Sequence, residues 1–309
     1  MQKKESNFNK SLKILVKSSA WVFVGIILSK ILGYVYRIIV ARYYGPEVYG
    51  LLILSLTIIG WFALFSLLGF DVGVLRYFSL YSTKKKDNKI SYIMKFSLSL
   101  LLITGIAAGI LLFIFSDLIA EKIFSNSQLS VFLKLFSLTI PLTSLKTVFF
   151  PLMQVYGKFE WVLFASKILD PLVKVIALVA LIFLGVNSIN VPISYLLAAI
   201  VVSLFAYLFC RISFKNIFKI KPIKNKQLAK DILSYSWPLL FFTLSMFLLY
   251  QVDSFMIGLL KTVEDVGFYN AAVPIALLLV TSVSLFSYMF FPVITQQYAK
   301  GNKEIVRQL

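Results

Sequence analysis

Two cations that share one face of an apolar helix are the first feature of the sequence that could do chemistry. Lys30 and Arg37 lie within a long apolar run and are seven residues apart, which places them on the same face of a helix. Cationic side chains inside a membrane helix are costly unless they face water, a cavity or a partner. Their spacing therefore predicts a positively charged lining along a transport path.

Lys167 and Lys174 repeat this spacing. At about 1.5 Å per residue, Lys30 lies about 18 Å and Lys174 about 20 Å from the cytoplasmic ends of their helices, near the middle of an apolar core about 30 Å thick. We predict that Lys30, Arg37, Lys167 and Lys174 form a cationic lining that contacts the substrate. The alternative is that Asp170, at i+3 from Lys167 and i−4 from Lys174, neutralises them as intrahelical pairs, with Lys167 reaching the head groups.

Composition assigns the chain to the membrane proteins. Of its 309 residues 60% are hydrophobic and 14% are charged, whereas soluble domains are about half apolar and a quarter charged. The net charge of +18 is carried by lysines clustered between apolar runs, which argues against nucleic acid as a partner. With no His and one Cys, most zinc sites and all Ser-His-Asp chemistry are excluded. We expect no cofactor.

Long apolar runs separated by short loops predict the topology. A spanning helix needs about 20 mostly apolar residues, and eight runs qualify. They cover residues 18–40, 49–70, 92–116, 129–152, 161–185, 190–211, 232–259 and 267–293. Lysine-rich and nearly neutral loops alternate, so the positive-inside rule places both termini in the cytoplasm. We expect an all-α polytopic protein with about eight transmembrane helices. The fourth and eighth helices should be kinked, at Pro141 and Pro274. We interpret Tyr34, Tyr36 and Tyr44 mainly as interfacial anchors.

A short internal similarity predicts a repeat. Pro46–Gly50 (PEVYG) resembles Val263–Gly267 (VEDVG), six spans later and in the same orientation. A parallel six-span repeat is typical of transporters whose substrate site lies between two halves; chance or shared turn chemistry is the alternative. We expect a basic cytoplasmic head at 1–17, a six-helix lobe at 18–212, a basic cytoplasmic linker at 213–231, and the first two helices of an incomplete second lobe at 232–309. Such a chain would be truncated, and it would pair with a missing C-terminal half, pair with a second copy, or be non-functional.

The repeat also predicts a gate. Arg37 stands 13 residues before Gly50, and Asp253 stands 14 residues before Gly267. The two residues would occupy nearly equivalent outer positions on the first helix of each lobe. An ion pair between them could close the outer end, whereas in the simpler interpretation Asp253 only borders the outer water.

Several segments carry a resemblance to a known family. They are YYGPEVYG (43–50), GFDVGVLRY (69–77), SWPLLFFTLSMFLLYQVDSFMIG (236–258), EDVGFYNAAVP (264–274) and FPVITQQYAKGN (291–302). Together they resemble the polysaccharide-biosynthesis (oligosaccharide) flippases of the MATE/MOP superfamily. The resemblance implies export of a polyprenyl-phosphate-linked oligosaccharide across the cytoplasmic membrane. On this resemblance we expect the cationic lining of Lys30, Arg37, Lys167 and Lys174 to attract the phosphate head group. Members of this family carry twelve or fourteen spans, more than the eight predicted here.

Three other functions compete with the flippase. A cation-coupled multidrug exporter of the same superfamily would need a carboxylate-bearing cavity, whereas the midplane charges here are mostly cationic. An enzyme acting on lipid-linked sugars would need catalytic outer loops, and these loops are short and show no nucleophile-base or metal-binding pattern. We therefore predict that the protein is not an enzyme. A structural scaffold is the third alternative.

Overall fold

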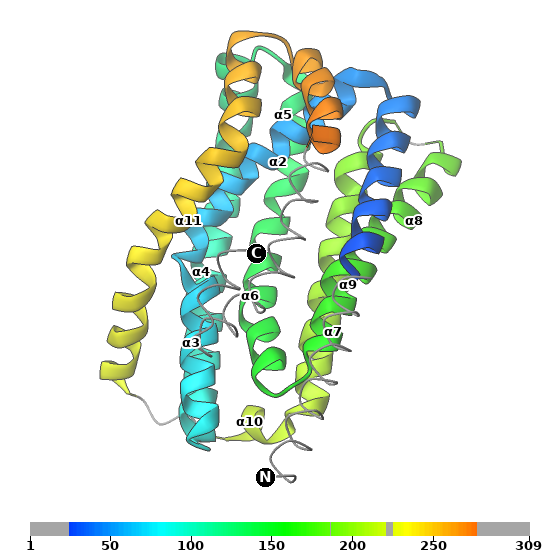
Figure 1. Ribbon diagram of the computed structural model, residues 1–309. Coiled ribbons are helices and arrows are strands. Elements are labelled where there is room, and N and C mark those ends of the chain that lie inside the picture. The colour runs from blue at the N-terminus through cyan, green and yellow to red at the C-terminus, as the bar shows by residue number, and fades with distance from the viewer. Residues whose placement is uncertain (1–24, 186, 221–224, 277–309) are drawn as a thin grey trace, which may run out of the picture.

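The computed structural model describes residues 25–185, 187–220 and 225–276. Within these ranges the chain forms helices and no β-strand, which confirms the predicted all-α class. The helices stand side by side in an elongated bundle (Figure 1). A first helix covers 25–43, and a last one covers 263–276. Between them lie α2 (Gly45–Leu67), α3 (Phe70–Thr83), α4 (Asp87–Leu118), η1 (Ile119–Ile123), α5 (Ser127–Ser137), α6 (Thr139–Val155), α7 (Phe159–Leu163), η2 (Phe164–Leu169), α8 (Asp170–Phe183), α9 (Asn190–Ser213), α10 (Lys215–Lys219) and α11 (Lys226–Leu260).

Several helices are long and apolar enough to cross a membrane. Among the described residues there are five, namely Gly45–Leu67, Asp87–Ile123, Ser127–Val155, Asn190–Ser213 and Lys226–Leu260. The chain is therefore a multi-pass membrane protein. The predicted spans 18–40 and 267–293 lie partly outside the described residues, so the total of eight stays a prediction.

The helical structure extends beyond residue 70, where the second predicted span ends. Leu68 (φ 51°) and Gly69 (φ 72°) adopt left-handed backbone and redirect the chain, and the helix resumes as α3. The Ser66 carbonyl, which this break frees from the helix, accepts a hydrogen bond of 2.7 Å from Thr104 on α4. The sequence predicted a loop after residue 70, but buried Phe70, Val74 and Phe78 hold α3 against α4 and α6.

The predicted kink at Pro141 is a break between two helices. Proline has no N–H to offer the carbonyl four residues earlier, and that carbonyl belongs to Ser137, the last residue of α5. The chain turns at Leu138 and continues as α6. Gly109 lets α4 approach this break, since a Cβ there would lie 3.0 Å from the Ser137 carbonyl oxygen.

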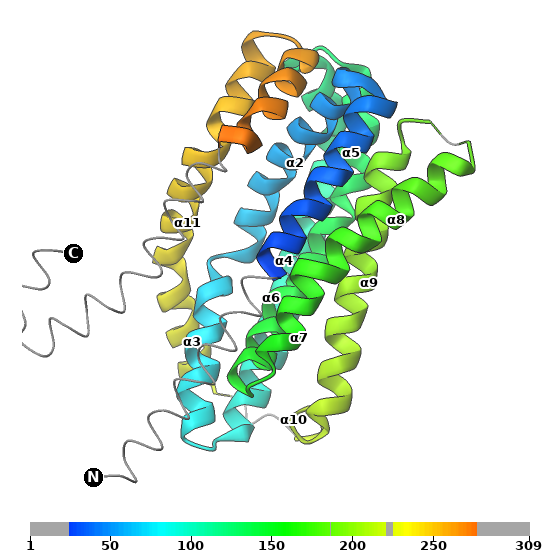
Figure 2. The same ribbon diagram turned by 45° about the vertical axis from the view of Figure 1, so that its right-hand side comes forward.

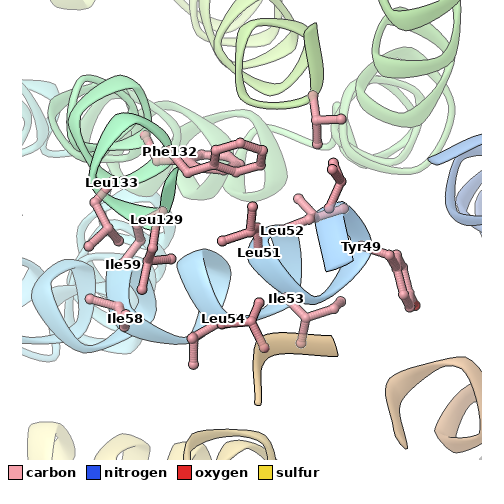
Figure 3. Close-up of a cluster of buried hydrophobic side chains, with 14 of the residues drawn as sticks. Tyr49, Leu51, Leu52, Ile53, Leu54, Ile58, Ile59, Leu129, Phe132 and Leu133 are labelled. Carbon is pink, nitrogen blue, oxygen red and sulfur yellow. The ribbon is translucent and has the colours of Figure 1, made fainter. Parts of the chain in front are cut away.

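Two hydrophobic clusters in the described part of the chain stabilise the bundle. One surrounds the N-terminal half of α2, where Leu51, Leu52 and Ile58 share a buried cluster with Leu129 and Phe132 of α5 (Figure 3). The other joins α3, α4, α6 and α9 to the start of α11. α2 is thus the central helix of the bundle, and its side chains are buried almost all round.

α11 lies at one edge of the bundle (Figure 2). It packs on α2 and α3, where Gly69 and Gly73 allow close approach to Ser236. The Arg76 guanidinium lies 4.0 Å from the centre of the Tyr235 ring, a favourable cation–π geometry. Much of the remaining α11 surface is apolar and exposed.

Candidate functional site

The helix over 25–43 positions the first pair of predicted site residues. It lies between α2 and α8 (Figure 2). Its buried face includes Tyr36. The Tyr36 hydroxyl donates a hydrogen bond to the Val191 carbonyl (3.2 Å) and forms a second one with the Ser194 hydroxyl (2.7 Å), both on α9. Tyr36 was predicted as an interfacial anchor, but it is 3% exposed and fixes the helix's rotation.

This rotation turns Lys30 and Arg37 toward a common cavity. The cavity has a volume of about 250 Å³, and Ser29, Lys30, Gly33, Tyr34, Arg37 and Pro274 line it. The predicted shared face is therefore present. Pro274 lies on the helix over 263–276, so the cavity lies between segments that are far apart in the sequence.

Two tyrosines fasten this cavity to the helix over 263–276. Tyr34 donates a hydrogen bond of 2.7 Å to the Pro274 carbonyl, and Tyr49 of α2 donates one of 3.1 Å to the Asn270 carbonyl. The Arg37 guanidinium is close enough to the Tyr49 phenol to interact with it electrostatically. Arg37 thus lines the cavity and lies near one of the two tyrosines.

The second predicted pair has different surroundings. The Lys174 ammonium forms an ion pair of 2.6 Å with Asp170 and lies 4.2 Å from the centre of the Tyr195 ring. The two side chains are 20% and 23% exposed. Lys146 is close enough to Asp170 and Lys174 to interact with both electrostatically. The intrahelical pair that the sequence offered as an alternative is thus present for Lys174.

Lys167 lies in a π-helical segment, η2, that precedes Pro171. The proline ring clashes with the carbonyl four residues earlier, and the wider turn relieves this clash. Lys167 packs against the first described helix, since a Cβ at Gly25 would lie 3.8 Å from the Lys167 Cβ. The structure thus brings Lys30 and Arg37 together at one cavity, and Lys174 and Asp170 together at another place.

Asp253 occupies an exposed position on α11. It accepts a hydrogen bond of 2.9 Å from Tyr269, whereas Arg37 interacts with Tyr49. No ion pair joins Asp253 to Arg37 in the described structure. The gate formed by these two residues stays a prediction.

The two similar segments of the sequence meet in a reciprocal contact. A Cβ at Gly50 would collide with the Val263 carbonyl oxygen, and a Cβ at Gly267 would collide with the Pro46 carbonyl oxygen. The contact therefore pairs the first residue of each segment with the last residue of the other. Such an isologous contact is expected of two copies related by a local two-fold axis.

The start of the last helix is stabilised locally. The Thr262 hydroxyl accepts a hydrogen bond from the Asp265 N–H (3.2 Å), and the Asp265 carboxylate accepts one from the Thr262 N–H (3.0 Å), a reciprocal capping box. Hydrogen bonds from the Thr262 N–H and hydroxyl lower the pKa of Asp265. The reciprocal glycine contact is thus formed by a helix whose first turn is fixed.

Sequence reasoning missed three site residues. Tyr34 was interpreted mainly as a membrane anchor, and neither Tyr49 nor Asn270 was singled out. The available signal was Pro274, because a proline leaves the carbonyl of Asn270 without its helical donor. The identity of the replacement donor depends on packing between distant segments.

The chain also resembles known proteins in sequence and in fold. A family model described as "Polysaccharide biosynthesis protein" matches residues 15–297. A solved structure titled "protein A" has the same fold, with a TM-score of 0.57 and 14% identity, over 86% of this chain and 60% of that one. This chain thus spans 60% of the length of that structure. No match was found among curated proteins. Since the family model covers most of its length, the chain belongs to the polysaccharide biosynthesis protein family.

Proposed function

We propose that the chain acts in a transporter that moves a lipid-linked saccharide unit across the cytoplasmic membrane, with both termini in the cytoplasm. The observation that carries this proposal is the cavity in which Lys30 and Arg37 meet Pro274. Membership of the polysaccharide biosynthesis family and the multi-pass helical fold support the same assignment.

The chemistry of the two cations suits a phosphate head group. Arg offers a planar fork of donors that binds two phosphate oxygens, and Lys adds a compact charge. In our proposal the polyprenyl tail stays in the bilayer while its phosphate is drawn to Lys30 and Arg37. We propose that Lys167 and Lys174 add positive potential at longer range, with the Lys174 charge partly offset by Asp170.

The proposed mechanism is alternating access between two lobes. Its support is the reciprocal contact of Gly50 and Gly267, which lies where the two predicted lobes (18–212 and 232–309) would meet. Rocking about this contact would expose the cavity to one side of the membrane and then to the other. We propose that a further C-terminal half, or a second copy, completes the enclosure.

The cavity favours an anionic substrate over the cationic substrates of a multidrug exporter. Its described lining contains two cationic side chains and no carboxylate. A positive potential repels organic cations and attracts phosphates. A multidrug exporter would instead need a cavity lined by negatively charged side chains.

The test uses cells that lack this gene and that carry either the wild-type protein or a variant. We expect deletion to accumulate the complete carrier-linked saccharide on the cytoplasmic face, measured by mass spectrometry of lipids and a sidedness assay. Arg37→Gln should reproduce the accumulation. The matched control is Lys134→Gln, which removes a lysine paired with Asp117 (2.7 Å) away from the cavity; it should complement.

Two results would contradict the proposal. One is a deletion strain with normal lipid intermediates and heightened sensitivity to cationic drugs, which would favour the exporter. The other is full complementation by Lys30→Gln/Arg37→Gln at wild-type abundance, which would remove the cavity from the mechanism.

A further inference from the structure

The last described helix contains a backbone carbonyl that its own sequence leaves unpaired. In an α-helix the carbonyl of Asn270 accepts a hydrogen bond from the N–H of residue 274. Residue 274 is proline and has no N–H. The Tyr49 hydroxyl of α2 takes its place, at 3.1 Å. The proline thus creates an acceptor for a donor on another helix.

A second bond lies one helical turn away on the same helix. The Tyr34 hydroxyl donates to the Pro274 carbonyl at 2.7 Å. The two tyrosines therefore donate to carbonyls one turn apart on this helix, and the nearer one is the carbonyl that the proline leaves without its helical donor. Pro274 itself lines the cavity of Lys30 and Arg37, so the fastening and the candidate site are adjacent.

Arg37 connects the two. Its guanidinium lines the cavity and lies close enough to the Tyr49 phenol to interact with it electrostatically. A positive charge near a phenol makes its O–H a stronger hydrogen-bond donor, because it draws electron density away from the hydrogen. Arg37 therefore strengthens the bond from Tyr49 to Asn270. An anion that draws Arg37 away weakens that bond.

We propose that Tyr49, with Tyr34, is a latch that couples occupancy of the cationic cavity to separation of the helix over 263–276 from α2. This inference rests on the proposed function, since it takes the cavity to bind a phosphate. An anion bound at Arg37 releases Tyr49, and the helix over 263–276 then lifts from α2. Tyr49 is a positioning residue, because it acts through Arg37 and Asn270.

The reporter is a cysteine at Val266. Val266 is fully buried, lies two turns from Pro274, and follows the exposed Glu264 at the end of the bundle, so a soluble maleimide reaches it when the helix lifts. The native Cys210 is replaced by Ala, and the full chain is reconstituted in vesicles. Inorganic pyrophosphate is the probe, and its binding is measured separately by calorimetry.

We expect pyrophosphate to raise the labelling rate of Val266→Cys about fivefold, the factor that corresponds to one typical hydrogen bond. Tyr49→Phe should label about fivefold faster without pyrophosphate and respond little to it, while still binding it. The matched control is Tyr156→Phe, which also loses a phenolic hydrogen bond, but to the Asp87 carboxylate, and neither of these residues lines the cavity. It should leave both rates unchanged.

A double-mutant cycle tests the role of the proline. In Pro274→Ala the N–H of residue 274 can bond the Asn270 carbonyl, so Tyr49→Phe should change the labelling rate less than in the Pro274 background. Equal effects in the two backgrounds would overturn the latch. Pyrophosphate that binds without changing the labelling rate would overturn the latch and leave the cavity's proposed function intact. Absence of pyrophosphate binding to the wild type would overturn both.

Discussion

Two lysine-containing pairs with the same seven-residue spacing have different surroundings. Lys30 and Arg37 share a cavity between distant segments, whereas Lys174 is paired with Asp170 and lies over Tyr195. Asp170 stands at i−4 from Lys174 and forms an ion pair with it. A cation paired with a carboxylate of its own helix stabilises the bundle, whereas a cation that faces a cavity can contact a ligand there. Spacing alone does not separate these roles.

The largest effect should follow from removing that carboxylate. Asp170→Asn leaves the Lys174 charge uncompensated among packed helices, close to the positive Lys146. We expect about 3 kcal/mol of destabilisation, the order found when one partner of a buried ion pair is removed, measured as thermal unfolding in detergent.

The double variant Asp170→Asn/Lys174→Gln is the control, because it removes both charges. It should recover much of the lost stability. If Asp170→Asn were as stable as the wild type, the structural role of the pair would be wrong.

The next largest effect concerns the helix over 263–276, which contributes Pro274 to the cavity of Lys30 and Arg37. Gly267→Ala places a methyl group against the Pro46 carbonyl oxygen, and overpacking of this kind costs about 2 kcal/mol. The helix over 263–276 should shift from α2, which hydrogen exchange in that helix can measure. Gly33→Ala is the matched control, since a Cβ at Gly33 meets nothing within 4 Å; its exchange should match that of the wild type.

Neutralising the cavity should affect transport more than stability. Arg37→Gln removes a charged donor to phosphate, and one charge-assisted hydrogen bond corresponds to roughly a tenfold loss of flipping rate or more. The unfolding temperature should change little compared with Asp170→Asn. A variant that loses stability and keeps its flipping rate would reverse the comparison between the two pairs.

The smallest effect should be a dependence on pH at the capped helix start. Because its folded pKa is lowered, Asp265 contributes stability above the ordinary carboxyl pKa of about 4, and this is lost as pH falls through the folded pKa. Hydrogen exchange of the first turn of the helix over 263–276, corrected for the intrinsic rate, should rise over that range. Asp265→Asn should abolish the dependence; a dependence retained in that variant would assign it to another group.

A second ionisable group, Tyr156 after the end of α6, has the opposite shift. Burial and a hydrogen bond of 3.1 Å to Asp87 raise the pKa of Tyr156 to about 12. Tyr156 therefore stays protonated throughout the pH range of that experiment. It adds no pH dependence there.

Local rules predicted the features that depend on local geometry. The shared face of Lys30 and Arg37 follows from helical periodicity, and the Asp170–Lys174 pair follows from i,i+4 spacing. Pro141 marked the break between α5 and α6 because it removes one donor. The similarity of Pro46–Gly50 to Val263–Gly267 indicated two segments that the structure brings into contact.

Features that depend on packing between distant segments were not predicted. A leucine with left-handed backbone at residue 68 is unfavourable locally, and burial of Phe70 and Val74 in α3 helps to hold the turn beside it. Tyr34 and Tyr49 became donors to the last helix because three segments pack together. α2 and α11 are both long and apolar enough to cross a membrane. Yet α2 is surrounded by helices, whereas α11 exposes much of its surface. Apolar composition does not distinguish a protein neighbour from lipid.

Pyrophosphate binding to the purified full chain at fixed ionic strength tests whether Lys30 and Arg37 form the anion site. The wild type, Lys30→Gln/Arg37→Gln and Asp170→Asn/Lys174→Gln would be compared by calorimetry. The account predicts that the first double variant loses binding and the second retains it. Binding that is lost only in the second double variant would contradict it and would move the anion site to Lys174.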